Sequence, residues 1–360
     1  MAMTVKRQTN FELLRIVAMG MIIVLHYLDR GRILAPYSED ASALNYTAWL
    51  IEAFCMVSVN CYVLISGYFL AESGWKPGRV VSLAAQVLFY SLLIPIVLFC
   101  LGLISGSGLS LYDWLTFIFP FQNEHYWFAT HYLVLYLFAP VLAAGVQKMD
   151  KKTLQTVIAL LIVFFSIAKT FVPFNLVMDA DGYHYGWFFC LFLVGAYIRK
   201  YGISKLDQRQ NGAVLYVGMC ILIWAISVFC GVMEQRTGAL SHYVGMPYTY
   251  NYFFVFLGSL GMFYWFKNMQ IKEGRAAEMI RRLAPYTFGI YLVHAHILLG
   301  GRWMYFLGVE KVRGTWLFIP HMIGCILVVY AAGTVIDFVR AWIFTQAVKL
   351  WKSKQKGNRR

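Results

Sequence analysis

The sequence predicts an all-α membrane protein, a bundle of about ten transmembrane helices with both termini in the cytoplasm. Hydrophobic residues make up 60% of the 360 residues and charged residues only 13%, whereas a soluble domain averages about 25% charged residues. The mean hydropathy is +0.61. The apolar residues form segments long enough to cross a bilayer, and the basic residues lie in the short loops between them, as the positive-inside rule expects.

The apolar segments follow one another along the chain and define ten candidate spans. The sixth is short for a full crossing and contains Gly186 and Gly195, so we expect it to be tilted, broken or partly re-entrant. The last is long, and we expect it to continue beyond Asp337 as an interfacial helix. The candidate spans are residues 11–28, 48–70, 80–104, 126–147, 153–173, 184–199, 211–232, 247–266, 284–301 and 315–345.

The loops between the spans predict the orientation and the domain organisation. Of the 31 Lys and Arg residues, 22 lie on one side of the spans, 6 lie in the alternate loops and 3 lie within spans. The positive-inside rule therefore places both termini in the cytoplasm. No loop is long enough for a separate soluble domain, so we expect one membrane-embedded domain over residues 1–360, with a short basic cytoplasmic tail at about 349–360. The net charge of +14 has the same loop distribution, which argues against a nucleic-acid partner.

The cysteines and the N-terminus exclude other classes of protein. None of the seven cysteines forms a CxxC pair, and most lie inside apolar spans, where a free thiol behaves as a small hydrophobe. We therefore expect neither a disulfide framework nor a metal site. The first apolar segment contains Arg15 and lacks a small-residue cleavage site, so we expect it to remain as a span and not to be removed as a signal peptide.

The first span carries two ionisable residues on one stripe. Arg15 and His26 are 11 positions apart, which at ~100° per residue is three turns plus about 20°, so both side chains face the same way. The rise between them is about 16 Å, roughly half a bilayer. The predicted topology places Arg15 toward the cytoplasm and His26 toward the outer side. Ionisable groups at membrane depth are costly and usually functional.

Each of these two residues also has a purely structural interpretation. Arg15 can pair with Glu12 three positions earlier, or it can form an anion site at the cytoplasmic mouth, because a guanidinium suits phosphate. His26 can hydrogen-bond a neighbouring helix, or it can move a proton at neutral pH. Asp29, three positions later, is close enough to orient its ring.

Several segments together resemble the acyltransferase-3 family of integral membrane acyltransferases. The resemblance begins with an arginine, ten residues and a histidine in the N-terminal span, here Arg15 and His26. Its further pieces occur in order over nearly the whole chain, without the appended extracellular domains of some members. They are VNCYVLISGYFL from Val59 to Leu70, HYWFATHYLVLYLFAPVL from His125 to Leu142, GWFFCLFLVGAYI from Gly186 to Ile198 and YTFGIYLVH from Tyr286 to His294.

The resemblance implies an enzyme that takes an acyl group from cytoplasmic acyl-CoA, with acetyl as the default. The acceptor it implies is a hydroxyl of an exported or lipid-linked cell-envelope glycan, and the location is the plasma (inner) membrane. The family's arginine and histidine correspond to Arg15, which would help hold CoA, and His26, which would act as general base or transient acyl carrier. We expect His125, Trp127 and His294 to contact the acceptor. The alternative is an aromatic interface anchor for Trp127 and a purely structural role for His294.

Other polar residues have simpler interpretations. We expect His296 to bond a neighbouring helix and Ser66 and Gly67 to serve helix packing. We expect Lys169 to extend to the outer interface. For Glu52 an interface position is favoured over a proton relay.

Two other function classes compete with the acyltransferase. A transporter or flippase for a polar solute or lipid-linked sugar explains buried polar groups and broken spans equally well. It does not explain the shared stripe of Arg15 and His26, and the sequence shows no inverted repeat. A scaffold for an envelope complex leaves both residues without a role.

Overall fold

The computed structural model describes residues 8–73, 76–104, 108–174 and 180–357, and these residues form helices and loops without a strand. The all-α prediction is therefore confirmed for the described part of the chain. The helices are α1 (Thr9–Arg30), α2 (Ala43–Cys55), α3 (Ser58–Leu70), α4 (Pro77–Cys100), α5 (Leu111–Ile118), α6 (Trp127–Lys148), α7 (Lys151–Ile162), α8 (Ala168–Phe171), α9 (Tyr185–Tyr201), α10 (Arg209–Thr237), α11 (His242–Gly245), α12 (Phe253–Lys267), α13 (Arg275–Leu283), α14 (Thr287–His294), α15 (Trp303–Phe306) and α16 (Phe318–Gly357).

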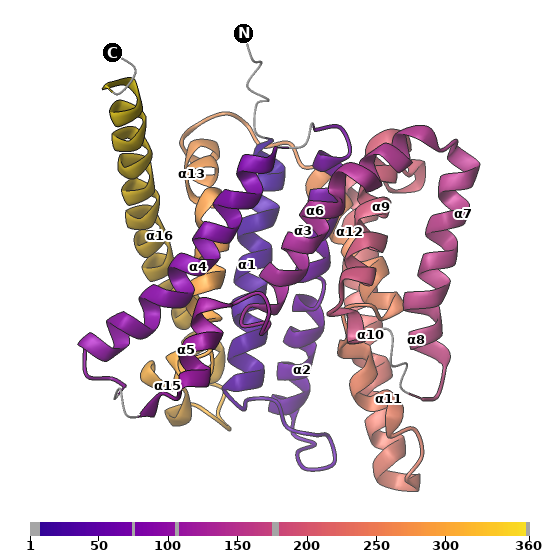
Figure 1. The fold of residues 1–360 in the computed structure, drawn as a ribbon. Coiled ribbons are helices and arrows are strands. Elements are labelled where there is room, and N and C mark those ends of the chain that lie inside the picture. The colour runs from indigo at the N-terminus through magenta and orange to yellow at the C-terminus, as the bar shows by residue number, and fades with distance from the viewer. Residues whose placement is uncertain (1–7, 74–75, 105–107, 175–179, 358–360) are drawn as a thin grey trace.

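Within the described residues, seven helical segments are long and apolar enough to cross a membrane. Helix α9, with 17 residues, is short, as expected of the sixth span. The total of about ten spans stays a prediction. Figure 1 shows that α1 begins and α16 ends at the same end of the bundle, while the side of the membrane on which that end lies stays a prediction too. The seven segments are Thr9–Arg30, Ala43–Leu70, Pro77–Cys100, Trp127–Lys148, Lys151–Phe171, Arg209–Thr237 and Phe318–Leu350.

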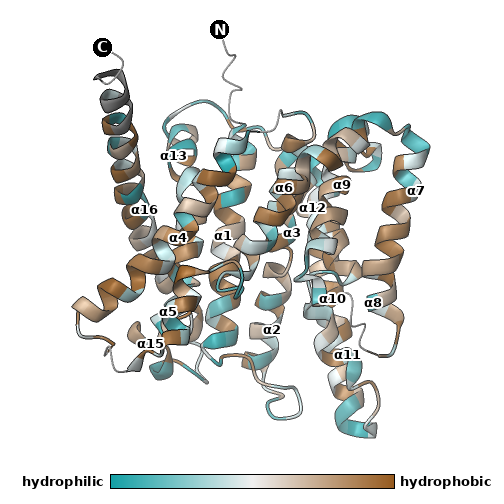
Figure 2. Cartoon of the chain, viewed as in Figure 1, coloured by the Kyte–Doolittle hydropathy of each residue, from teal (hydrophilic) through white to brown (hydrophobic). Residues whose placement is uncertain are grey.

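The outer surface of the bundle is apolar where the helices are long. Val141 on α6, Val214 on α10 and Leu327 on α16 are all more than 60% exposed. In Figure 2 the hydrophobic colour runs along the peripheral helices, and hydrophilic residues gather mainly toward the two ends. Large exposed aliphatic side chains along several helices suit lipid as the surrounding solvent.

Helix α1 lies in the middle of the bundle (Figure 1) and contacts α2, α3, α12, α13, α14 and α16. Its Leu14, Ile23 and Leu28 are fully buried. Two hydroxyls on other helices fix its backbone, because the Tyr62 hydroxyl donates to the Arg15 carbonyl at 2.6 Å and the Tyr330 hydroxyl to the Ile16 carbonyl at 2.7 Å. The first span is therefore the core helix about which the others pack.

Small residues bring α3 and α9 into close contact. A Cβ on Gly67 would lie 2.2 Å from the Phe192 carbonyl oxygen, and one on Gly195 would lie 2.4 Å from the Leu64 carbonyl oxygen. Glycine at both positions lets the two backbones approach as helices do in membranes. The packing role expected of Gly67 is confirmed.

Candidate functional site

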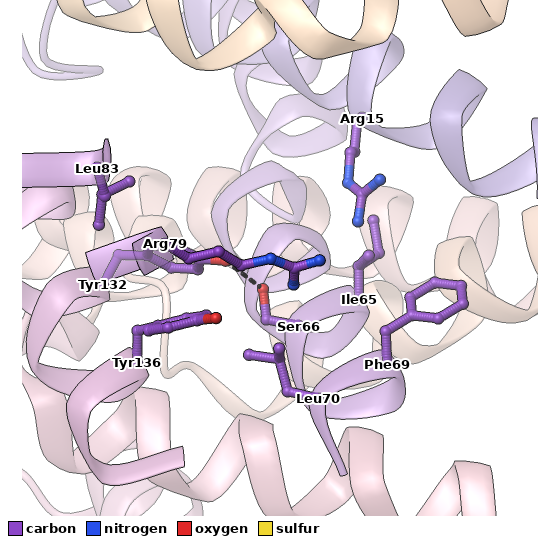
Figure 3. A pocket seen from close by; sticks show the side chains of 9 residues that line it. All are labelled: Arg15, Ile65, Ser66, Phe69, Leu70, Arg79, Leu83, Tyr132 and Tyr136. Carbon is purple, nitrogen blue, oxygen red and sulfur yellow. Dashed lines mark hydrogen bonds between the residues drawn. The ribbon is translucent and has the colours of Figure 1, made fainter. Parts of the chain in front are cut away.

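The N-terminal end of α1, which the predicted topology places on the cytoplasmic (inner) side, opens onto a pocket that contains two arginines, which we call the inner pocket. Its volume is about 210 Å³, and α1, α3, α4 and α6 contribute its wall. Figure 3 shows the guanidinium groups of Arg15 and Arg79 turned toward the same space beside Ser66. The Ser66 and Tyr132 hydroxyls lie 3.1 Å apart within hydrogen-bonding distance. The remaining lining residues are Ile65, Phe69, Leu70, Leu83 and Tyr136.

Arg15 fits both interpretations that its sequence context allows. Its Nη1 donates to Oε1 of Glu12 at 2.7 Å, so the ion pair exists. Its side chain nevertheless keeps 30% of its surface exposed, against 7% for Glu12, and lines the pocket. A guanidinium has five N–H donors, so one contact with Glu12 leaves donors for an anion. Glu12 thus also orients Arg15.

The C-terminal end of α1, which the predicted topology places on the outer side, brings His26 against a second histidine. The rings of His26 and His294 are 5.1 Å apart between centroids and inclined at 51°. His294 is 2% exposed, and its Nδ1 lies 2.7 Å from the Ile290 carbonyl oxygen. A carbonyl only accepts, so Nδ1 carries the proton, and in the neutral ring Nε2 has the lone pair.

The histidine pair has nitrogen atoms without partners. Among the described residues, neither Nδ1 of His26 nor Nε2 of His294 has a hydrogen-bond partner, although both atoms are buried. Buried polar atoms are nearly always satisfied, so these two nitrogens are free to bond a third molecule that reaches the pair. A neutral imidazole nitrogen with a lone pair can accept a proton from that molecule. No hydrogen bond joins Asp29 to His26 in the described structure, so the ring neighbour of His26 is His294, not Asp29.

A cation lies close to this pair. Arg30, at the end of α1, interacts electrostatically with both His26 and His294. Its guanidinium packs over Gly300, where a Cβ would lie 2.3 Å from Nη1. The glycine thus makes room for the guanidinium beside the imidazoles. A fixed positive charge there favours any negative charge that develops next to the pair.

His125 and Trp127 belong to two different clusters. His125 is 9% exposed and packs against His296 at 4.4 Å between ring centroids. Its Nε2 accepts from the Ile297 N–H at 3.5 Å, and burial lowers the pKa of His125 to about 4. His296 bonds the Ser91 carbonyl oxygen on α4, so its expected helix-bonding role is confirmed. An acceptor contact of His125 stays a prediction.

Trp127 faces an aromatic cluster at the start of α6. Its ring lies 4.5 Å from Tyr183 and 5.7 Å from Tyr250 between centroids, and it stacks on Tyr250 with an interplanar angle of 25°. Trp127 is partly exposed, and Tyr183 is 43% exposed. Both rings keep part of their surface exposed, and the two interpretations of Trp127, an acceptor contact and an interface anchor, stay predictions.

Two charged residues of the spans are enclosed by the protein. Glu52 is 8% exposed, and its Oε2 is buried without a partner in the described structure. Lys169 is 5% exposed and pairs with Asp181 at 2.5 Å. The interface positions expected of both residues stay predictions. Hydrophobicity along one segment gives the depth of a residue but not the helices that surround it.

The sequence interpretation also missed part of the inner pocket. The sequence interpretation treated Arg79 only as one of the basic loop residues that predict the orientation, and Tyr132 and Tyr136 only as residues of a membrane span. What could have indicated Arg79 is its position three residues after Lys76, at the same predicted end of the bundle as Arg15. For the tyrosines no signal exists in the linear sequence, because their hydroxyls reach the pocket from another helix.

The family model for the acyltransferase-3 domain, described as an acyltransferase domain, matches residues 8–338. This match includes both ends of α1 and every residue of the inner pocket. Searches of curated proteins and of solved structures find no match.

Proposed function

Because the chain belongs to the acyltransferase-3 family of membrane proteins, we propose that it transfers an acyl group, acetyl by default, from cytoplasmic acyl-CoA to a glycan. The acceptor is a hydroxyl of an exported or lipid-linked cell-envelope glycan at the outer face of the plasma (inner) membrane. One observation carries the proposal. A single buried helix has an arginine pocket at one end and, at the other, a histidine pair whose nitrogens Nδ1 of His26 and Nε2 of His294 have no partner among the described residues.

The inner pocket suits the phosphates of the donor. Arg15 and Arg79 supply two guanidinium groups to one space, and guanidinium binds phosphate in a planar, two-pronged geometry. The hydroxyls of Ser66 and Tyr132 add neutral hydrogen-bonding groups. The pantetheine arm would then extend along α1 over the roughly 16 Å that separate Arg15 from His26.

The outer end suits the transfer step. The acceptor hydroxyl loses its proton to His26 while its oxygen attacks the thioester carbonyl; the C–S bond breaks and CoA leaves as a thiol after taking up a proton. In the other version, His26 itself attacks and holds the acyl group before the hydroxyl takes it. In both versions the positive charge of Arg30 would stabilise the oxyanion, and Nε2 of His294 would be a nearby proton acceptor.

Mass spectrometry of envelope glycans from cells with and without the gene tests this proposal against transport. An acyl mass that is missing without the gene supports the enzyme, and unchanged acylation with a missing glycan in the envelope supports a transporter. With purified protein, release of free CoA thiol that depends on an added glycan acceptor is the direct measurement.

A further inference from the structure

The loop that follows α14 brings a group of cations to the C-terminal end of α1. Of the six Lys and Arg residues in the loops that the predicted topology places outside, five lie in two segments, the end of α1 and residues 295–315. Helix α15 of that loop lies beside the C-terminal end of α1 (Figure 1). We call these five residues the basic corner: Arg30, Arg32, Arg302, Lys311 and Arg313.

One tyrosine of α15 joins three of these arginines. The Tyr305 hydroxyl donates to the Arg30 carbonyl oxygen at 3.2 Å and accepts from Nη2 of Arg313 at 3.4 Å. The Tyr305 backbone N–H donates to the Arg302 carbonyl oxygen at 3.0 Å. The guanidinium of Arg30 packs against Gly300, two residues before Arg302. These contacts hold the three arginines in one part of the molecule.

The protein does not neutralise the positive charge of the basic corner. Among the described residues none of its five cations forms an ion pair, whereas Arg199, Lys267 and Arg281, on the predicted cytoplasmic side, each pair with a carboxylate. Only two carboxylates lie in the same two segments, Asp29 and Glu310, so the cations exceed them by three. Arginine stays protonated in proteins, and outer loops are normally poor in Lys and Arg. Unpaired cations gathered there indicate a site for an anion.

The basic corner is accessible and lies one helical turn from His26. Arg302 and Arg313 are exposed, and Arg30 is half-buried. Arg30 follows His26 by four positions on α1, so the two side chains lie on the same face, about 5–6 Å apart along the helix. A molecule that binds the arginines through a charged group therefore brings its neighbouring groups to the histidine pair.

A further unpaired donor lies on α15. Trp303, directly after Arg302, is 8% exposed, and its buried Nε1 has no partner among the described residues. An indole N–H and a guanidinium are both donors only, so they suit a ligand group with several acceptor oxygens. Guanidinium groups bind carboxylate and phosphate in a planar, two-pronged geometry.

We propose that the basic corner binds a carboxylate or phosphate group of the acceptor, so that the acceptor is an acidic glycan or one that carries phosphate. The bound charge positions the acceptor hydroxyl beside His26. This inference rests on the proposed function for the identity of the bound molecule as the acceptor. Binding of an anionic sugar is measurable without any acyl donor, so the two can fail separately.

The experiment compares a neutral and two anionic probes that share one aglycone: p-nitrophenyl β-glucoside, p-nitrophenyl β-glucuronide and p-nitrophenyl β-glucoside 6-phosphate. Their binding is measured by saturation-transfer NMR titration of the full chain in phosphatidylcholine nanodiscs without acyl-CoA. We expect at least one anionic probe to bind about tenfold more tightly than the glucoside. The carboxylate and phosphate probes distinguish the two sources of the charge.

Substitutions of the exposed arginines assign this preference to the basic corner. Arg302→Gln and Arg313→Gln should each lower it by about two- to fivefold, as expected of exposed ionic contacts, and the double variant should nearly abolish it. Arg302→Lys, which keeps the charge, should retain most of it. Arg236→Gln removes an exposed arginine at the end of α10, outside the corner, and is the matched control. Arg15→Ala should also leave the preference unchanged, because Arg15 belongs to the inner pocket.

Equal binding of all three probes, a preference that survives the double variant, or one that Arg15→Ala abolishes would overturn the inference. Arg302 and Arg313 are exposed, so their replacement should leave the fold intact. An anion preference that depends on these arginines, together with unchanged envelope acylation in cells without the gene, would leave the basic corner standing and remove the proposed reaction instead.

Discussion

The two ends of α1 differ in how their polar groups are treated. At the N-terminal end, Arg15 is 30% exposed and ion-paired, and the Ser66 and Tyr132 hydroxyls lie within hydrogen-bonding distance of each other. At the C-terminal end, His294 is 2% exposed, and one nitrogen of His26 and one of His294 have no partner among the described residues. On the proposed function, the accessible arginine would bind the donor and the buried imidazoles would take part in the transfer step.

Removal of the His26 imidazole should have the largest effect on acyl transfer. We expect His26→Ala to lower the acyl-transfer rate by about 10²- to 10⁴-fold, the usual contribution of a positioned general base. The protein should still accumulate in membranes with unchanged donor binding. His242→Ala, at α11 and away from α1 in Figure 1, is the control and should retain wild-type transfer. Wild-type transfer by His26→Ala at equal protein level would return His26 to a structural role.

The second histidine tests whether the pair acts as a unit. We expect His294→Gln to lower kcat by about 10- to 100-fold with little change in the donor KM, because only the proton acceptor is altered. The double variant His26→Ala/His294→Gln should be hardly worse than His26→Ala alone, since residues that act as a unit are not additive. Fully additive losses in transfer rate would show that the two rings act independently.

Arg15 tests the inner end as a binding site. A charge-assisted contact is worth ~1.5–3 kcal/mol, so Arg15→Ala should raise the apparent acyl-CoA constant by about 10- to 150-fold. Arg15→Lys should recover part of this, because the planar fork is lost. The measurement is acyl-CoA titration of the purified protein in detergent.

Glu12→Gln separates this role from a structural ion pair. If the pair only holds the fold, Glu12→Gln should do as much damage as Arg15→Ala, and both should appear as less folded protein. An unchanged donor constant in well-folded Arg15→Ala would contradict the donor site.

Arg79 provides a milder test of the same pocket, because it is exposed. Exposed ionic contacts contribute about 0.2–1 kcal/mol, so Arg79→Ala should raise the donor constant by only about 1.5- to 5-fold. Lys76→Ala, also exposed but not part of the pocket wall, is the matched control. Equal effects of the two substitutions on the donor constant would show that Arg79 does not bind the donor and only contributes to the orientation in the membrane.

Salt should produce the smallest effect and separate the two ends of α1. Raising the ionic strength from 0.05 to 0.5 M shortens the screening length severalfold, so the donor KM should rise a fewfold through Arg15 and Arg79. The kcat at saturating donor should hardly change, because the histidine pair is buried and neutral groups are not screened. A kcat that falls as steeply as donor binding would place an exposed charge in the chemical step.

The first helix shows which features of the site can be predicted from the sequence alone. The placement of Arg15 and His26 on one face of a helix follows from the helical period, which is local and does not depend on neighbours. His294 and Trp127 were also among the predicted site residues, because of the family resemblance. Their surroundings were not predicted, since ring partners such as Tyr183 and Tyr250 come from loops more than 50 residues away.

By itself the sequence determined the membrane class, the all-α fold and the polar stripe on the first helix, because hydropathy and periodicity are properties of contiguous residues. Only the tertiary structure decided that His26 meets His294, that Arg79 shares a pocket with Arg15, and that Glu52 is buried. In a membrane the apolar pattern gives each helix its span but does not specify its neighbours. Which faces meet depends on close packing of small residues and on hydrogen bonds between helices, and these contacts join residues that are distant in the chain.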